Sequence, residues 1–152
     1  MKDKKNGFTL IELILVIAII GIMSVATIVS LQGGKVKKDL ESSAREVSAA
    51  IRESQNSALT GKIASESCKR YYFSYTSSSV NYTVGGSGCP EIQYKLKNGV
   101  TFASGGSFSF EVPFGTLSTS GNVSIQLRKN GESYYICVGP SGSILEQKDA
   151  CP

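Results

Sequence analysis

The sequence contains no histidine and no tryptophan, and charged residues make up only 18% of its 152 positions. Without histidine the chain lacks the commonest general base and the commonest metal ligand in proteins. The remaining polar residues form no nucleophile–base pair and no group of carboxylates with the spacing of a metal site or a glycosidase. We therefore predict that the chain is not an enzyme, holds no metal or cofactor, and takes no small-molecule substrate.

The net positive charge is also small. It is formally +4, and part of it comes from Lys2, Lys4 and Lys5. So small an excess is not typical of a nucleic-acid-binding surface. The segment Lys69-Arg70-Tyr71-Tyr72 does combine cations with aromatic rings, as platforms for single strands do. The same segment also fits the start of a β-strand whose alternate tyrosines pack inward. Nucleic acid is not an expected partner.

The least polar part of the chain runs from Phe8 to Leu31, and Glu12 is its one charged residue. As a helix rising about 1.5 Å per residue, this run would be about 36 Å long, more than the roughly 30 Å core of a bilayer. It predicts a transmembrane helix with the basic N-terminus in the cytoplasm. A secretory signal has a shorter apolar stretch. A plain single-pass anchor leaves Glu12 unexplained, since a carboxylate at such a depth costs about 2.5–3.5 kcal/mol.

The residues Lys5-Asn6-Gly7-Phe8-Thr9-Leu10-Ile11-Glu12 resemble the processing signal of type IV prepilins, in which a short basic leader and a glycine precede phenylalanine. The resemblance continues to about Leu31. It implies that prepilin peptidase cuts after Gly7 and methylates the new amine of Phe8. It also implies that Glu12 pairs with the terminal amine of a neighbouring pilin or pseudopilin subunit during assembly. The implied location is the inner membrane, with the C-terminal domain in the periplasm or outside, and afterwards a filament.

The four cysteines form no CxxC pair, so their spacing does not indicate a zinc site. An even number of cysteines in a small exported domain predicts disulfides, which require an oxidising compartment. Three connectivities are open. We favour Cys68–Cys89 and Cys137–Cys151 because each closes a short loop, which stabilises by about 3 kcal/mol in the chain-entropy description. Four reduced core thiols are the alternative.

Beyond the apolar run, hydrophobic residues from Val36 to Ala58 recur at three- and four-residue steps among charged residues, which predicts an amphipathic helix ending near Gly61. The simplest arrangement is one helix from Phe8 to about Thr60, with Gly33-Gly34 as a weak point. The later chain predicts short β-strands. We expect them near residues 71–76, 80–84, 91–97, 107–112, 123–128, 133–138 and 143–146.

Glycine, asparagine and proline mark the expected connections between these strands. Asn130-Gly131 predicts a hairpin, and Asn98-Gly99 is a second hairpin candidate. Pro140-Ser141-Gly142 predicts a turn, and Gly85-Gly86-Ser87-Gly88 predicts a flexible loop.

The expected fold class is α+β, with a long N-terminal helix packed on an antiparallel β domain. Its expected parts are a leader (1–7), a transmembrane helix (8–31), an amphipathic helix (32–62) and a globular β domain (63–152).

The C-terminal third, from Phe114-Gly115-Thr116 to Gly139-Pro-Ser-Gly-Ser-Ile144, resembles the end of the H-type pseudopilin of type II secretion and of related type IV minor pilins. This resemblance implies a minor pilin or pseudopilin built into a type IV pilus or a secretion pseudopilus. Some relatives bind DNA through arginines where this chain has Ser143-Ile144-Leu145. The alternatives are a filament-tip module that binds DNA or a secreted substrate, and a major pilin.

Overall fold

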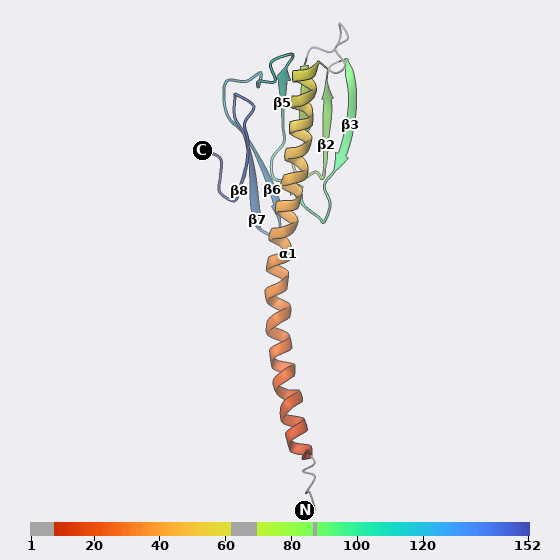
Figure 1. Ribbon diagram of the computed structural model, residues 1–152, viewed down its shortest axis with the longest axis vertical. Coiled ribbons are helices and arrows are strands. Elements are labelled where there is room, and N and C mark those ends of the chain that lie inside the picture. The colour runs from red at the N-terminus through yellow and green to blue at the C-terminus, as the bar shows by residue number, and fades with distance from the viewer. Residues whose placement is uncertain (1–7, 62–69, 87) are drawn as a thin grey trace, which may run out of the picture. The chain divides into compact units, whose positions relative to one another are not determined.

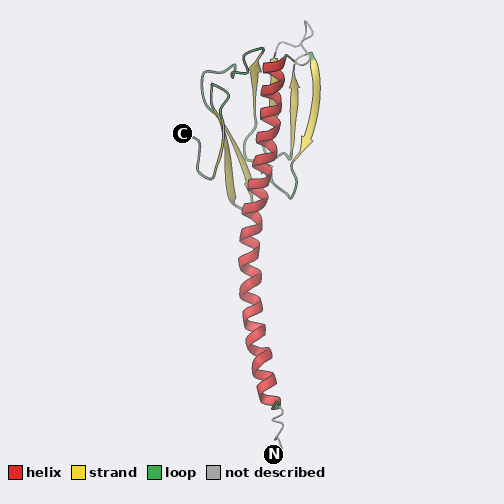
Figure 2. Cartoon of the chain, in the orientation of Figure 1, coloured by secondary structure: helices red, strands yellow, loops and turns green. Residues whose placement is uncertain are grey.

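The computed structural model describes residues 8–61, 70–86 and 88–152, and it gives only the backbone at residues 25–32 and 89. Within these ranges the chain forms a long helix and two antiparallel sheets (Figures 1 and 2). The chain divides into two compact units, Met1–Lys35 and Val36–Pro152. The expected α+β fold class is confirmed.

Helix α1 extends from Leu10 to Thr60, close to the bounds predicted from the apolar spacing. It is continuous through Gly33 and Gly34, so the expected weak point does not end it. Gly61 follows the last helical residue with φ of 58°. This left-handed conformation is the usual C-cap, and glycine adopts it without the strain that a Cβ would cause.

Two four-stranded sheets make up the rest of the unit Val36–Pro152. The first, here called the β1 sheet, has the order β3-β2-β1-β5, and the second, the β7 sheet, has the order β4-β6-β7-β8. All seven predicted strands are present within two residues at each end, whereas β4 has no counterpart among the predictions. The bounds are β1 Arg70–Tyr75, β2 Asn81–Gly86, β3 Cys89–Lys95, β4 Thr101–Phe102, β5 Gly106–Glu111, β6 Val123–Lys129, β7 Glu132–Val138 and β8 Ile144–Gln147.

Alternation along β1 decides which side chains enter the core. Tyr71, Phe73 and Tyr75 are buried, whereas Arg70 and Tyr72 lie on the opposite face of the sheet. The Phe73 ring is completely buried, and its centroid lies 5.4–5.8 Å from those of three other core rings, which is the separation typical of attractive aromatic pairs. The prediction that alternate tyrosines of this segment pack inward is confirmed.

The C-terminal part of α1 packs on both sheets through the predicted apolar stripe (Figure 1). Its residues Leu40, Ala44, Val47, Ile51 and Ala58 are buried in one cluster with residues of the β1 and β7 sheets. Polar contacts flank this stripe. The Lys129 ammonium lies 2.6 Å from the Asp39 carboxylate, and both side chains are largely buried, so the β6–β7 hairpin is held against the helix.

One of the two hairpin predictions is confirmed and the other is wrong. Asn130 and Gly131 both have positive φ, 48° and 84°, and join the paired strands β6 and β7. Asn98 and Gly99 also form a tight turn, but β3 and β4 on either side belong to different sheets. The turn therefore carries the chain from the β1 sheet to the β7 sheet. Local turn chemistry fixed the backbone conformation, whereas packing decided the partners of the strands.

The predicted flexible loop at residues 85–88 is wrong for its first half, since Gly85 and Gly86 belong to β2. A Cβ at Gly85 would lie 2.7 Å from Cγ of Glu91, a side chain of the neighbouring strand β3. Position 85 therefore requires glycine because Glu91 lies so close to it, and not because the segment is a flexible loop.

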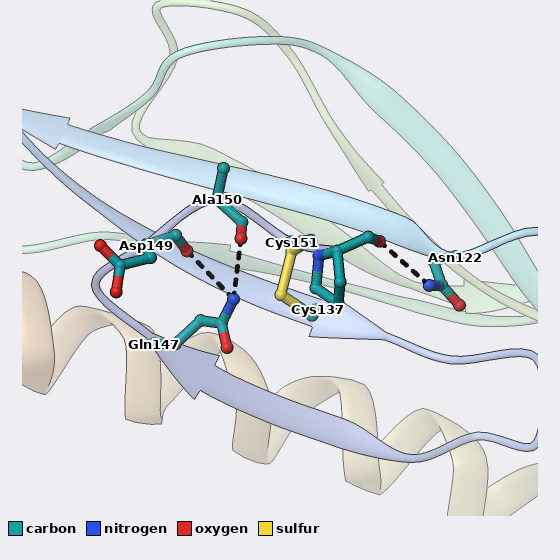
Figure 3. Close-up of a disulfide and its surroundings, with 7 residues drawn as sticks. Asn122, Cys137, Gln147, Asp149, Ala150 and Cys151 are labelled. Carbon is teal, nitrogen blue, oxygen red and sulfur yellow. Dashed lines mark hydrogen bonds between the residues drawn. A yellow bond between two sulfur atoms is a disulfide. The ribbon is translucent and has the colours of Figure 1, made fainter.

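The C-terminal segment is fastened to the β7 sheet by a disulfide between Cys137 and Cys151, whose Cα atoms are 5.6 Å apart (Figure 3). The Gln147 side-chain amide donates to the carbonyls of Asp149 and Ala150, at 3.1 and 2.9 Å. The Asn122 amide donates to the carbonyl of Pro152 at 3.3 Å. This half of the predicted pairing is present in the structure. Cys68 of the other pair lies outside the described residues.

A single side chain of α1 contacts loops that belong to both sheets. The Gln55 amide donates to the carbonyl of Gly115, which follows β5, at 3.1 Å. The same nitrogen would lie 1.9 Å from a Cβ at Gly142, in the turn between β7 and β8. Gly142 has φ of 82°. Glycine at position 142 therefore adopts a left-handed backbone conformation and also leaves room for the Gln55 amide.

Gly142→Ala is expected to destabilise the fold by about 2–3 kcal/mol, because the left-handed strain is joined by loss of the Gln55 hydrogen bond. Gly131→Ala is the matched control, since Gly131 has φ of 84° and no heavy atom near the added Cβ. It should lose only about 1 kcal/mol. Urea unfolding of both variants measures the difference, and equal losses would show that the contact with Gln55 contributes nothing.

Tyr82 carries a buried hydroxyl that has no hydrogen-bond partner among the described residues. Burial raises the pKa of its phenol far above the ordinary value, and the nearby acidic groups Glu46, Tyr94 and Glu53 raise this pKa further. Burial also raises the pKa of Tyr75. Both phenols therefore stay neutral in the folded protein at a pH where they ionise in the unfolded chain.

The free energy of unfolding should accordingly fall as the pH rises above about 10, because the unfolded state then binds fewer protons than the folded state. Tyr82→Phe should be neutral or stabilising at pH 7, since it removes an unsatisfied buried group. It should also reduce the alkaline fall by up to about 1.4 kcal/mol per pH unit. Urea unfolding between neutral pH and pH values above 10 tests both, and an alkaline slope unchanged by the substitution would contradict the assignment.

Candidate functional site

The start of α1 is capped by the side chain of Thr9. The Thr9 hydroxyl accepts a hydrogen bond from the Glu12 backbone N–H at 3.4 Å. The Thr9 carbonyl accepts from the N–H groups of Glu12 and Leu13, at 3.1 and 3.3 Å. Thr9 is therefore the N-cap, and Glu12 lies in the first turn, where the helix dipole favours a carboxylate. Sequence reasoning missed this cap, although Thr9-Leu-Ile-Glu12 is its signature.

In the unit Met1–Lys35, the helix residues 10–24 present apolar side chains on every face. Every described side chain from Phe8 to Ser24 is exposed, with Phe8 85%, Leu10 76% and Ile22 75% accessible. A helix that is apolar all round is normally buried, either in lipid or among other helices. Exposure on this scale marks a surface that another apolar phase or partner covers.

Over the residues that the structure describes, no helix is long and apolar enough to cross a membrane, so the transmembrane prediction for residues 8–31 is not confirmed.

Glu12 is the acidic residue of this apolar surface. No cation among the described residues lies within ion-pair distance of its carboxylate. A carboxylate covered by lipid or by apolar helices gains most from an opposite charge, because desolvation without such a partner is costly. Phe8 lies one helical turn before Glu12, outside the capped helix, and Gly7 lies outside the described residues. The arrangement can thus recruit a cation while its apolar flanks are being covered.

Residues 2–28 match the family described as the prokaryotic N-terminal methylation motif. The chain carries the type IV pilin signal. This pilin signal marks a substrate of prepilin peptidase and, in general terms, a protein that assembles with other pilins. The α+β structure of the chain fits a pilin-like fold. No curated protein and no solved structure matches the chain.

The pilin signal ends before the β domain, so the resemblance of the C-terminal third to H-type pseudopilins stays a prediction. The segment considered as a nucleic-acid platform is divided by the fold. Tyr71 is buried, Tyr72 lies on the outer face, and Lys69 is outside the described residues. Carboxylates lie beside the two remaining side chains. Glu111 lies 3.6 Å from Arg70, and Glu91 accepts a hydrogen bond from the Tyr72 hydroxyl. These charges disfavour a polyanionic ligand.

Thr9→Val, which keeps the shape of the side chain but removes the acceptor, should weaken the first turn of α1 by about 1 kcal/mol. The backbone amides of Glu12 and Leu13 should then exchange with solvent about fivefold faster. Hydrogen exchange of the full-length chain in detergent measures this effect. Thr9→Ser, which retains the hydroxyl, is the control and should exchange like the wild type. Unchanged exchange in Thr9→Val would refute the cap.

Proposed function

We propose that this chain is a filament subunit, either a minor pilin or an H-type pseudopilin, of a type IV pilus or a type II secretion pseudopilus. Prepilin peptidase cleaves it between Gly7 and Phe8 and methylates the new amine of Phe8. The chain acts as a structural protein and not as an enzyme. The observation that carries this proposal is an apolar helix, exposed on all faces from Leu10 to Ser24, with Glu12 of the pilin signal in its capped first turn.

Before assembly, the N-terminal helix lies in the inner membrane, and Lys2, Lys4 and Lys5 keep the leader in the cytoplasm. The β domain is then on the periplasmic side. The Cys137–Cys151 disulfide supports this placement, because such bonds persist in oxidising compartments.

During assembly, the helices of neighbouring subunits replace lipid as the cover of the apolar surface. Each Glu12 carboxylate pairs with the Phe8 amine of another subunit as both leave the bilayer. The carboxylate enters a dry interface only if that amine neutralises it, since an unpaired buried charge costs about 3–5 kcal/mol. Charge pairing thereby sets the axial register, while apolar packing supplies the attraction.

Glu12→Ala is expected to leave cleavage after Gly7 intact but to lower incorporation into filaments by about tenfold or more, since the Phe8 amine is left unpaired. Mass spectrometry of the processed N-terminus and quantification of the subunit in sheared filaments measure the two steps separately. Glu132→Ala removes an exposed carboxylate of the β6–β7 hairpin and is the matched control. Gly7→Ala, which should keep its leader, provides the unprocessed standard. Normal amounts of Glu12→Ala in filaments would refute the pairing.

A further inference from the structure

A shallow groove of about 340 Å³ lies on the outer face of the β1 sheet. It is here called the β1–β5 groove, and it is lined by Arg70, Tyr72, Ser107, Phe108, Ser109, Ser118 and Thr119. Its volume falls at the lower end of the range of about 300–1,000 Å³ that is typical of ligand pockets. The pilin signal and the assembly helix give it no role.

Tyr72 is fixed at one side of this groove. In the register of the sheet it lies opposite Gly85 of β2, and its hydroxyl donates a hydrogen bond to the Glu91 carboxylate of β3. The Glu91 side chain lies against Gly85, where a Cβ would be 2.7 Å from its Cγ, and its carboxylate meets the Tyr72 hydroxyl. The hydrogen bond to Glu91 raises the pKa of Tyr72, so the phenol stays a neutral donor under physiological conditions. An aromatic ring held in this way binds a flat ligand with little further loss of conformational entropy.

Hydroxyl groups line the opposite side of the groove. The segment after β5 folds back along that strand, with the Ser118 N–H donating to the Ser109 carbonyl at 2.9 Å. The hydroxyls of Ser109 and Ser118 then lie 2.7 Å apart, and Ser118 and Thr119 are exposed. Each hydroxyl both donates and accepts hydrogen bonds. This wall therefore matches a ligand whose own polar groups are hydroxyls or amides.

The charges of the described residues around the groove disfavour a polyanionic ligand. The Arg70 guanidinium lies 3.6 Å from the Glu111 carboxylate, and Glu91 is held at the Tyr72 side. Among the described residues at this groove, two carboxylates accompany the Arg70 guanidinium, and this arrangement disfavours a chain of phosphates. A neutral ligand meets no such penalty.

We propose that the β1–β5 groove binds a neutral oligosaccharide. The C–H face of one sugar ring stacks on Tyr72, and the ring hydroxyls bond to Arg70, Ser109, Ser118 and Thr119. No covalent step is involved. The groove makes the β domain a recognition surface for glycans, an activity beyond assembly that does not depend on the proposed role of Glu12.

The test uses the full-length chain in a detergent without a sugar headgroup, with triacetylchitotriose and cellotriose as neutral probes. Saturation-transfer NMR should show contact between the protein and the ring protons of at least one probe at millimolar concentration. Tyr72→Ala should weaken binding by at least fivefold, as expected for loss of a stacking platform worth about 1–3 kcal/mol. Tyr72→Phe keeps the ring but loses the hydrogen bond that fixes it to Glu91, so it should bind more weakly than the wild type and more tightly than Tyr72→Ala.

The matched control is Tyr135→Ala, which removes a half-buried tyrosine of β7 in the other sheet and should bind like the wild type. If circular dichroism shows that Tyr72→Ala does not fold, Thr119→Arg replaces it, since the longer side chain at this exposed position fills the groove and should abolish binding. The proposal is overturned if neither sugar receives saturation from the wild type, or if the groove variants bind as well as the wild type. It is also overturned if the groove instead retains single-stranded DNA in a salt-dependent manner.

Discussion

Burial of one narrow helical stripe holds the unit Val36–Pro152 together. Each sheet has an apolar inner face that cannot be left in water, and the stripe from Leu40 to Ala58 shares a core with both faces. Small residues such as Ala44 and Ala58 are completely buried there. Their size allows the helix to come close to the large aromatic rings of the β1 sheet. Without this stripe, the β1 sheet would expose a patch of phenylalanine and tyrosine rings, and the β7 sheet would expose a largely aliphatic patch.

The two units obey different physical rules, although α1 runs through both. In Val36–Pro152 the apolar residues occupy one side of the helix, and the chain itself covers them. In Met1–Lys35 they occupy all sides of the described helix, and none of the residues 8–24 is buried. A one-sided apolar stripe stabilises the fold of its own chain, whereas a helix that is apolar on all sides needs lipid or other helices to cover it. A carboxylate has a different meaning in each setting. Asp39 has its own lysine partner, while Glu12 has none among the described residues.

Local chemistry made much of this architecture predictable. Short β-rich runs between turn residues located seven strands, and Asn130-Gly131 identified a true hairpin, because these signals depend on neighbours in the sequence. The division into two sheets was not predictable in this way. Asn98-Gly99 has the same turn residues, yet its strands find partners elsewhere, and β4 is too short to leave a periodic signal.

The candidate site shows the same contrast. The pilin signal around Gly7, Phe8 and Glu12 was readable because its residues are consecutive. The β1–β5 groove was not, since Tyr72, Ser109 and Ser118 come together only after β1 pairs with β5 and the chain folds back. Gly85 led to a wrong loop prediction, because the sequence does not distinguish a glycine in a flexible loop from a strand glycine that is covered by a neighbouring side chain.

The contacts that fasten α1 to the sheets also constrain the order of events on the ribosome. Gln55 of the helix bonds to Gly115, 60 residues downstream, and Asp39 pairs with Lys129, 90 residues downstream. Nearly the whole chain must therefore emerge before the amphipathic stripe can be covered, and such distant pairings close slowly. A nascent chain in this state exposes apolar surface along its helix. Such a surface is prone to aggregation, so we expect chaperones to bind the chain until synthesis is complete.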